Sequence, residues 1–310
     1  MLTQMKKSKV LLIVPKYNFR YFTKDVNKPN YTYLFPMGLA YISAVLKKAG
    51  YEVDCLNLNH HGEIINIINK SLNKKYDYVC LGASALEYPI AKLIVETVKK
   101  YSSKPKIILG GLLITSEPEV VFEDLKIDYG IIGEGEEIIV DLLNHLDKNK
   151  NVNKVKGIIY RNNYNKIVFT GRRELDDNLD NLPFPDVEGI GLREQLDNLP
   201  CNFSYRVSSF DYPRVYTMVA SRSCPFNCTF CSHYNKYRKR SIDNVMQELY
   251  MVVKKYKINL IIYYDECVAL DKERLYELCE RMQKLRKETP WELKWTPQLT
   301  VQKIDKKIQI

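Results

Sequence analysis

Short apolar runs alternate with amphipathic segments through the first half of the chain, from Lys9 to His145. Rich in Val, Ile and Leu and ended by polar or glycine-containing turns, the runs predict strands over residues 9–15, 51–58, 77–84, 106–111 and 128–135. Apolar residues three and four positions apart predict helices over 36–49, 63–72, 89–101, 117–125 and 136–146. Strands that are apolar on both faces and joined by helices require a parallel sheet between helical layers. We therefore predict an α/β domain over residues 1–148, with a doubly wound, Rossmann-like parallel sheet of the flavodoxin type.

Open parallel sheets bind ligands beyond the carboxyl ends of their strands, where the strand order reverses. The loops expected at that edge contain Pro15, the turn 84–88 that starts at Ser84, the pair Gly110 and Gly111, and the run Gly133, Glu134, Gly135 and Glu136. Small residues there let a ligand approach the backbone, although turns between strand and helix also use glycine for their own geometry. No Gly-x-Gly-x-x-Gly motif follows the first strand, which argues against a dinucleotide.

The rhythm breaks over residues 149–213, where we place a hairpin and a linker. Two alternating runs within 155–171 predict the hairpin, and the acidic, proline-containing segment 176–186 predicts the connector. Three strand-and-helix repeats then fill residues 214–310, with strands expected over 214–223, 258–266 and 291–299. Ser241 and Asp271 are the expected caps of the two intervening helices.

Composition supports a soluble two-domain protein, since 310 residues with 45% apolar and 27% charged positions exceed what one core usually holds. The net charge of +10 does not favour nucleic acid as a partner, because the lysines gather at helix ends and in loops. No stretch approaches the roughly 18 apolar residues of a membrane span. Pro15 ends the first apolar run too soon for a secretory signal, so we expect a cytoplasmic protein.

Cysteine spacing is the strongest chemical signal in the chain. Five cysteines lie scattered in apolar or amphipathic segments and are expected to be small buried side chains: Cys55, Cys80, Cys201, Cys267 and Cys279. The other three, Cys224, Cys228 and Cys231, fall within the eight residues CPFNCTFC, a spacing that chance gives in about half a percent of chains with this cysteine content. Zinc would take His233 as a fourth ligand, although no second ligand pair is present. A 4Fe–4S cluster held by three thiolates would keep one iron open for a substrate or cofactor.

CPFNCTFC after a predicted strand, with an aromatic residue before the third cysteine, resembles the signature of the radical S-adenosylmethionine (radical SAM) superfamily. The resemblance implies a 4Fe–4S cluster on Cys224, Cys228 and Cys231, whose open iron binds the amino and carboxylate groups of S-adenosylmethionine. Reduction of that cofactor would give methionine and a 5′-deoxyadenosyl radical. By the same resemblance Phe230 would lie beside the adenine, and Asp265 and Glu266 match the place where relatives bind the amino group or ribose. Acidic residues also end strands simply because the edge is solvated.

The first half resembles the cobalamin-binding domain that precedes the radical barrel in one large class of that superfamily. The resemblance covers most of residues 9–145 and rests on YLFPMGLAYISAVLKKAGYEVDCLNLN, on LGG followed by PEVVFED, and on DYGIIGEGEEIIVDLL. It implies cobalamin at the edge described above, near Pro15, Ser84, Gly110, Gly111, Gly133, Glu134, Gly135 and Glu136.

Three departures from that family pattern shape the expectations. PKYNFRY stands where other cobalamin domains have D-x-H-x-x-G, so no histidine ligand to cobalt is expected from that loop, and His60 and His61 are expected to be a solvated pair. Leu112, Leu113 and Ile114 are bulky where relatives carry a small, polar stretch. Thr300 stands where many relatives have an arginine.

Family barrels usually have six strand-and-helix units, whereas residues 214–310 supply three. We therefore expect the first half of a radical barrel. Three explanations are open: the sequence is a fragment of a longer enzyme, a partner completes the barrel, or the activity has been lost.

Two functional hypotheses follow. The first is a cobalamin-dependent radical SAM enzyme, with methyl transfer as one reaction, a small-molecule or peptide substrate, and an electron donor such as flavodoxin or ferredoxin. The second is a non-catalytic cofactor-binding or metal-stabilised protein, with iron–sulfur or zinc holding the second domain together.

Overall fold

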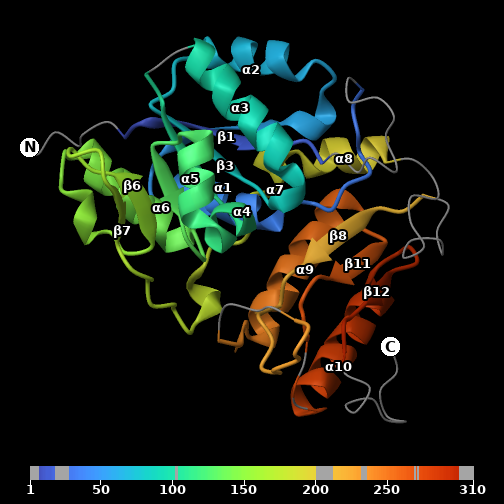
Figure 1. Cartoon of the computed structure of the whole chain (residues 1–310). Coiled ribbons are helices and arrows are strands. Elements are labelled where there is room, and N and C mark those ends of the chain that lie inside the picture. The colour runs from blue at the N-terminus through green and yellow to red at the C-terminus, as the bar shows by residue number, and fades with distance from the viewer. Residues whose placement is uncertain are drawn as a thin grey trace, which may run out of the picture. The chain divides into compact units, whose positions relative to one another are not determined.

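The computed structural model describes residues 7–17, 28–101, 104–199, 212–231, 236–268, 270 and 272–299. The chain divides into two compact units (Figure 1). Unit 1 consists of Met1–Leu175 and Pro183–Leu192, and unit 2 of Asp176–Leu182 and Arg193–Ile310. The domain limits expected at 148 and 214 stay predictions.

Unit 1 contains a seven-stranded sheet in the order β2-β1-β3-β4-β5-β6-β7. Its first five strands are parallel: β1 (Lys9–Val14), β2 (Glu52–Asn57), β3 (Tyr78–Gly82), β4 (Lys106–Gly110) and β5 (Tyr129–Ile131). The order 2-1-3-4-5 is that of flavodoxin-like sheets and confirms the predicted fold class, with the reversal of order at β1 and β3. The predicted hairpin, β6 (Ile158–Arg161) and β7 (Ile167–Phe169), adds two antiparallel strands beside β5.

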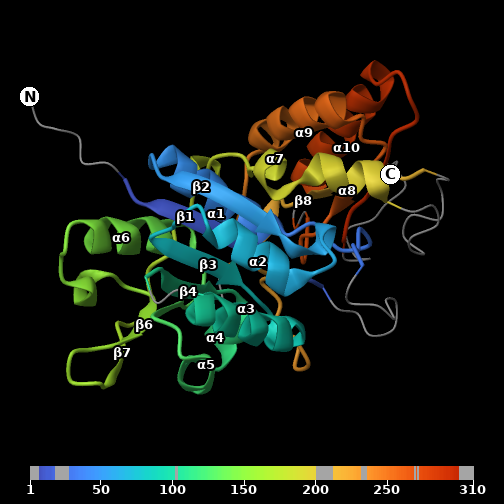
Figure 2. The ribbon, with the colours of Figure 1, turned by 90° about the horizontal axis from the view of Figure 1, so that it is seen from above.

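The five helices predicted for the first half are all present: α1 (Met37–Lys48), α2 (Ile64–Leu72), α3 (Tyr88–Tyr101), α5 (Pro118–Leu125) and α6 (Glu136–Asp147). Gly50 follows α1 with a φ of +86°, the left-handed conformation expected there. α2 and α3 lie side by side in both views (Figures 1 and 2) and pack with α5 on the core that covers one face of the sheet.

Short helical segments occupy several of the loops. They are α4 (Leu112–Ser116), α7 (Val187–Ile190) and α8 (Leu192–Asn198), with the 3₁₀ turns η1 (Leu58–His60), η2 (Ala85–Glu87), η3 (Val152–Lys154) and η4 (Leu179–Asn181). The sequence pattern did not predict α4, which begins directly after the glycine pair at the end of β4. No described helix is both long and apolar enough to cross a membrane.

Unit 2 contains a parallel three-stranded sheet, β12-β11-β8, formed by β8 (Val215–Met218), β11 (Leu260–Tyr263) and β12 (Lys294–Thr296). The long helices α9 (Ile242–Tyr256) and α10 (Lys272–Glu288) connect these strands, as the sequence pattern predicted. Ser241 caps α9, because its Oγ accepts a hydrogen bond from the Asn244 N–H at 3.1 Å. Asp271 and Thr300 lie outside the described residues. The fold is therefore a partial strand-and-helix barrel, as expected.

Candidate functional site

The three closely spaced cysteines lie in a loop with a narrow base. β9 (Ser221–Arg222) pairs antiparallel with β10 (Arg238–Lys239), and the Arg240 N–H extends the ladder by donating to the Ala220 carbonyl at 2.9 Å. We call these paired segments, residues 220–222 and 238–240, the neck. The neck follows β8 closely, so the sheet fixes the chain on either side of the segment that carries the cysteines. We call this segment the cysteine loop; the structure describes it over residues 223–231 and 236–237.

Within the described part of that loop, Cys224 is half-buried and Cys228 and Cys231 are exposed. The Cys231 N–H donates to the Cys228 carbonyl at 3.0 Å. Phe230 is 90% exposed, so its ring is available to stack on a planar ligand.

The structure does not gather the three sulfurs. Among the residues that it describes, no three His, Cys, Asp or Glu side chains meet in a metal-ligand arrangement. His233, the fourth ligand of the zinc alternative, lies outside the described residues. The donor chemistry nevertheless suits an iron–sulfur cluster, because three soft sulfur ligands lie on one short, accessible loop.

The other described cysteines differ sharply from the trio. Cys80, Cys267 and Cys279 are buried, as expected for small apolar side chains, whereas Cys55, which was also expected to be buried, is half-buried. Burial raises the pKa of Cys55 to about 11 and that of Cys80 to about 12. These groups remain neutral thiols, which are poor metal ligands. Cys201 lies outside the described residues.

The two acidic residues after β11 face different surroundings. Asp265 is 1% exposed, and its carboxylate accepts hydrogen bonds from the Ala220 N–H at 3.2 Å and from Ser221 Oγ at 2.6 Å. Burial raises the pKa of Asp265 to about 6, against the opposing effect of these hydrogen bonds. Glu266 is exposed, so its carboxylate is accessible to a ligand.

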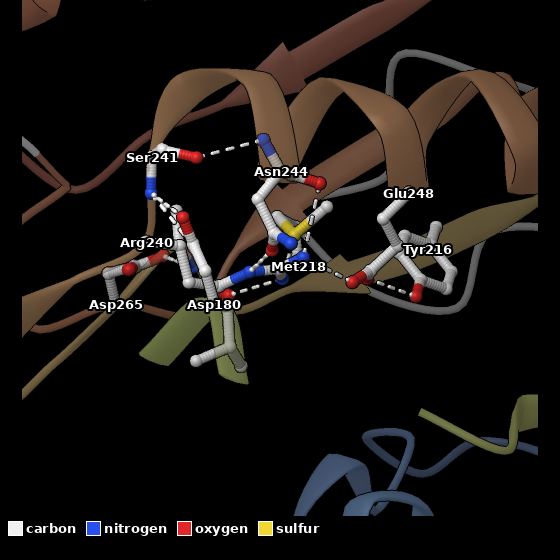
Figure 3. A network of polar contacts seen from close by, with 10 residues as sticks. Asp180, Tyr216, Met218, Arg240, Ser241, Asn244, Glu248 and Asp265 are labelled. Atoms are coloured by element: carbon white, nitrogen blue, oxygen red, sulfur yellow. Dashed lines mark hydrogen bonds and ion pairs between the residues drawn. The ribbon is translucent and has the colours of Figure 1, made fainter. Parts of the chain in front are cut away.

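A buried ion pair on the other side of the neck was not predicted from the sequence. Arg240 and Glu248 are both buried, and their charged groups lie 2.8 Å apart. Figure 3 shows the network around them, in which the Tyr216 hydroxyl donates to Glu248 at 2.6 Å and Arg240 Nε donates to Asn244 at 2.7 Å. A signal was available, because Glu248 stands on the apolar face of α9 between Val245 and Val252.

The carboxyl edge of unit 1 uses mainly backbone and small residues. Gly111 has a φ of +91°, and a Cβ there would lie 2.7 Å from the Ala83 carbonyl oxygen, so this glycine is required by packing. Gly133 also has a positive φ, of +87°, but a Cβ there would meet nothing within 4 Å. Gly110 is equally uncrowded, since a Cβ there would come no closer than 4.0 Å to Ile131. Gly110 and Gly133 therefore leave the room at this edge that a ligand would need.

The remaining residues predicted at this edge are mostly engaged in holding the loops. Ser84 and Glu87 form a capping box at η2, and the Pro15 carbonyl accepts a hydrogen bond from Asn59 Nδ2 at 3.1 Å. Glu136 is the buried first residue of α6, whereas Glu134 and Gly135 before it are half-buried. The three bulky residues after Gly111 differ in exposure. Leu113 and Ile114 are buried in the core, whereas Leu112 is 59% exposed.

The expectation that His60 is solvated is wrong. His60 is buried in η1, where its Nε2 shares a hydrogen bond with the Tyr33 hydroxyl at 2.8 Å and its ring stacks on Tyr31 at 5.2 Å. His61, by contrast, is half-buried. Aromatic residues from a segment far upstream in sequence supply this environment, which is why the local pattern did not reveal it.

Comparison with known proteins shows similarity in both units of the chain. Residues 24–143 match the model of the B12 binding domain. An uncharacterized methyltransferase of Pyrococcus horikoshii is 26% identical over 311 residues, which is 98% of this chain and 62% of that protein. The chain therefore contains a region similar to the B12 binding domain, and over most of its length it is similar to enzymes described as a methyltransferase and as a cyclase.

A further relative and a solved structure are also similar to this chain. The anaerobic magnesium-protoporphyrin IX monomethyl ester cyclase of Rubrivivax gelatinosus is 28% identical over 260 residues, covering 80% of this chain and 44% of the cyclase. The fold matches that of TsrM from Kitasatospora setae, a radical SAM methyltransferase solved with cobalamin and a 4Fe–4S cluster, with a TM-score of 0.71 and 16% identity over 97% of this chain and 56% of that one. The chain thus spans less than two thirds of the length of the relatives that it matches.

Proposed function

We propose that the protein is a cobalamin-dependent radical SAM enzyme and that methyl transfer is its reaction type. The observation that carries the proposal is the accessible loop with three thiols and an exposed Phe230, set at the carboxyl end of a parallel sheet. Relatives described as methyltransferases, and TsrM with its bound cobalamin, support the reaction type.

Cys224, Cys228 and Cys231 would hold a 4Fe–4S cluster, and Phe230 and Glu266 belong to the proposed S-adenosylmethionine site, whereas the buried Asp265 carboxylate is engaged by Ala220 and Ser221. When bound, the cluster would supply an electron that cleaves S-adenosylmethionine to a 5′-deoxyadenosyl radical, and cobalamin would carry the methyl group. Exposed Phe230 offers an aromatic face for the adenine, and exposed Glu266 offers a carboxylate for the amino group or ribose.

Cobalamin would lie against the carboxyl edge of unit 1. The open backbone at Gly110 and Gly133 gives a large planar ligand access to the main chain, and exposed Leu112 supplies an apolar contact. The other residues proposed for this site are Pro15, Ser84, Gly111, Glu134, Gly135 and Glu136. His60 is engaged with Tyr33 and Tyr31, so the proposal includes no contact between His60 and cobalt.

The proposal includes a cytoplasmic location, an electron donor such as flavodoxin or ferredoxin, and a small-molecule or peptide substrate. A reducing compartment keeps the exposed thiols of Cys228 and Cys231 available to metal.

Anaerobic reconstitution with iron and sulfide tests this function. We expect iron and sulfide to bind together, a reduced-cluster electron paramagnetic resonance (EPR) signal that changes when S-adenosylmethionine is added, and 5′-deoxyadenosine after reduction. One zinc per chain without iron or sulfide would contradict the proposal and favour a metal-stabilised, non-catalytic protein. Titration with hydroxocobalamin, followed by its visible spectrum, tests the edge of unit 1 separately.

A further inference from the structure

The cysteine loop depends on its neck for position. The β9–β10 ladder is only two residues long on each strand, and the three sulfurs are not gathered in the described structure. A short ladder of exposed loop segments is weakly stable by itself, since an isolated two-stranded hairpin is marginal in water. Other groups must therefore hold the two ends of the loop if the thiolates are to converge on one metal centre.

Asp265 holds the incoming end of the neck. Its two carboxylate oxygens accept from the Ala220 N–H and from Ser221 Oγ, which are consecutive residues three and four positions before Cys224. Ser221 Oγ also lies 3.0 Å from the Cys267 carbonyl, so the loop end is bound at several points to the segment after β11. Because Asp265 is 1% exposed and both its oxygens are engaged, its carboxylate is directed at the neck and away from solvent.

Arg240 and Glu248 hold the outgoing end. Arg240 reaches back across the neck, where its NH1 donates to the Val219 carbonyl at 3.0 Å, while its NH2 pairs with Glu248 at 2.8 Å. Tyr216 of β8 donates to the other Glu248 oxygen, so this pair connects β8, the neck and α9 (Figure 3). Both side chains are buried, so removal of either partner takes away the opposite charge that this ion pair supplies.

We propose that Asp265 and the Arg240–Glu248 pair are positioning residues, which fix the two ends of the cysteine loop so that its three thiolates meet on one cluster. This inference rests on the proposed function. It assigns Asp265 to the neck and leaves Glu266, the exposed neighbour, as the carboxylate that contacts S-adenosylmethionine.

Two substitutions of Asp265 distinguish the effect of its hydrogen bonds to the neck from the effect of its charge. Asp265→Ala removes both acceptors, whereas Asp265→Asn keeps an oxygen for the Ala220 N–H and can donate its amide to Ser221 Oγ. The single Ser221 hydroxyl proton would then be free to be donated to the Cys267 carbonyl, which lies 3.0 Å away. Glu248→Gln breaks the buried ion pair but keeps an acceptor for Tyr216. Asp243→Ala is the matched control, because Asp243 is an exposed carboxylate on the first turn of α9 and is paired with Arg281.

The experiment has two measurements on the full chain. The first is amide hydrogen exchange of the metal-free protein, read by mass spectrometry over residues 219–223 and 237–241. The second is the rate at which a chelator removes the cluster from reconstituted protein, together with the EPR spectrum with and without S-adenosylmethionine.

We expect Asp265→Ala and Glu248→Gln to speed exchange in the neck, to raise the rate of cluster loss about tenfold, and to broaden the EPR signal. Asp265→Asn and Asp243→Ala should resemble the wild type in all three. The proposal is overturned if Asp265→Ala keeps the wild-type rate of cluster loss and EPR spectrum, whether or not exchange in the neck changes. A wild-type chain that takes up no iron and sulfide is a separate result, seen before any variant is compared, and it overturns the proposed function together with this inference.

Discussion

The carboxyl edges of the two units are built in different ways. At the edge of unit 1 the backbone itself forms the surface, and glycines with positive φ, such as Gly111 and Gly133, set its shape. At the corresponding edge of unit 2, side chains set the shape, because Asp265 and Arg240 form hydrogen bonds to the residues at the base of the cysteine loop. A surface made of backbone is fixed by packing and tolerates few substitutions, whereas a loop held by buried charges can be altered at one end without loss of the sheet. The two edges should therefore respond differently to mutation.

The largest expected effect is at the cysteine loop. Cys228→Ala removes one of three thiolates and should abolish iron loading, measured as iron and sulfide per chain after anaerobic reconstitution. Unit 1 should stay folded, because its sheet has a separate core, and this is checked by far-ultraviolet circular dichroism. Cys279→Ala, at a buried thiol in α10, is the control and should load iron normally. Equal loss of iron in both variants would remove the distinction between the trio and the scattered cysteines.

Loss of the buried carboxylate on α9 comes next. Glu248→Ala leaves the Arg240 guanidinium buried without its counter-charge and should lower the free energy of unfolding of unit 2 by about 3 to 5 kcal/mol. Urea unfolding of the metal-free chain measures the loss. Asp243→Ala, which breaks the exposed pair with Arg281, should cost no more than about 1 kcal/mol. A similar small cost for both variants would mean that the buried pair does not secure the neck.

The pH dependence of Asp265 gives a third comparison. The pKa of this carboxyl is about 6 in the folded protein against 3.8 ordinarily, so between these values the folded state keeps a proton that the unfolded state releases. The stabilising contribution is complete below pH 3.8 and is lost as the pH rises through 6. Wild-type stability relative to Asp265→Asn should therefore fall by about 2 kcal/mol between pH 4 and pH 7.

Urea unfolding of both proteins across that pH range measures the difference in their free energies of unfolding. The contributions of the carboxylates that the two proteins share cancel in this difference. A flat difference between the wild type and Asp265→Asn across this range would contradict a raised pKa for Asp265 in the folded state.

The glycines of unit 1 give a comparison of packing with backbone conformation alone. Gly111→Ala combines a left-handed φ with a clash against the Ala83 carbonyl and should cost about 3 kcal/mol. Gly133→Ala has a similar φ but open space, so it should cost about 1 kcal/mol. Urea unfolding of unit 1, followed by circular dichroism, compares the two. Equal costs would mean that packing against the backbone of Ala83 does not account for Gly111.

The sequence pattern predicted the elements that depend on local periodicity. The five parallel strands, the Ser241 cap and the apolar faces of α9 and α10 were all readable, because each rests on residues within a few turns of one another. The cysteine spacing likewise pointed to the loop that carries it. What the pattern did not show are contacts between distant segments, since these depend on topology.

Two residues illustrate the limit. His60 reads locally as part of a polar loop, yet Tyr31 and Tyr33, nearly thirty positions upstream, enclose it. Glu248 stands on the apolar face of its helix, which marks it as unusual, but only the fold shows that it faces Arg240 and Tyr216. For Asp265 the pattern placed the residue at the correct strand end, but the direction of its carboxylate came from the structure.

The exposure of Cys228 and Cys231 also has a consequence for handling the protein. Thiols that metal can reach can equally be reached by oxygen and peroxide, whereas Cys80, Cys267 and Cys279 are sheltered by the core. Air should therefore damage the loop first, by sulfenic acid or disulfide formation, while both sheets stay intact. A preparation that looks well folded by circular dichroism can thus have lost its capacity for metal, and mass-spectrometric mapping of cysteine oxidation would reveal that loss.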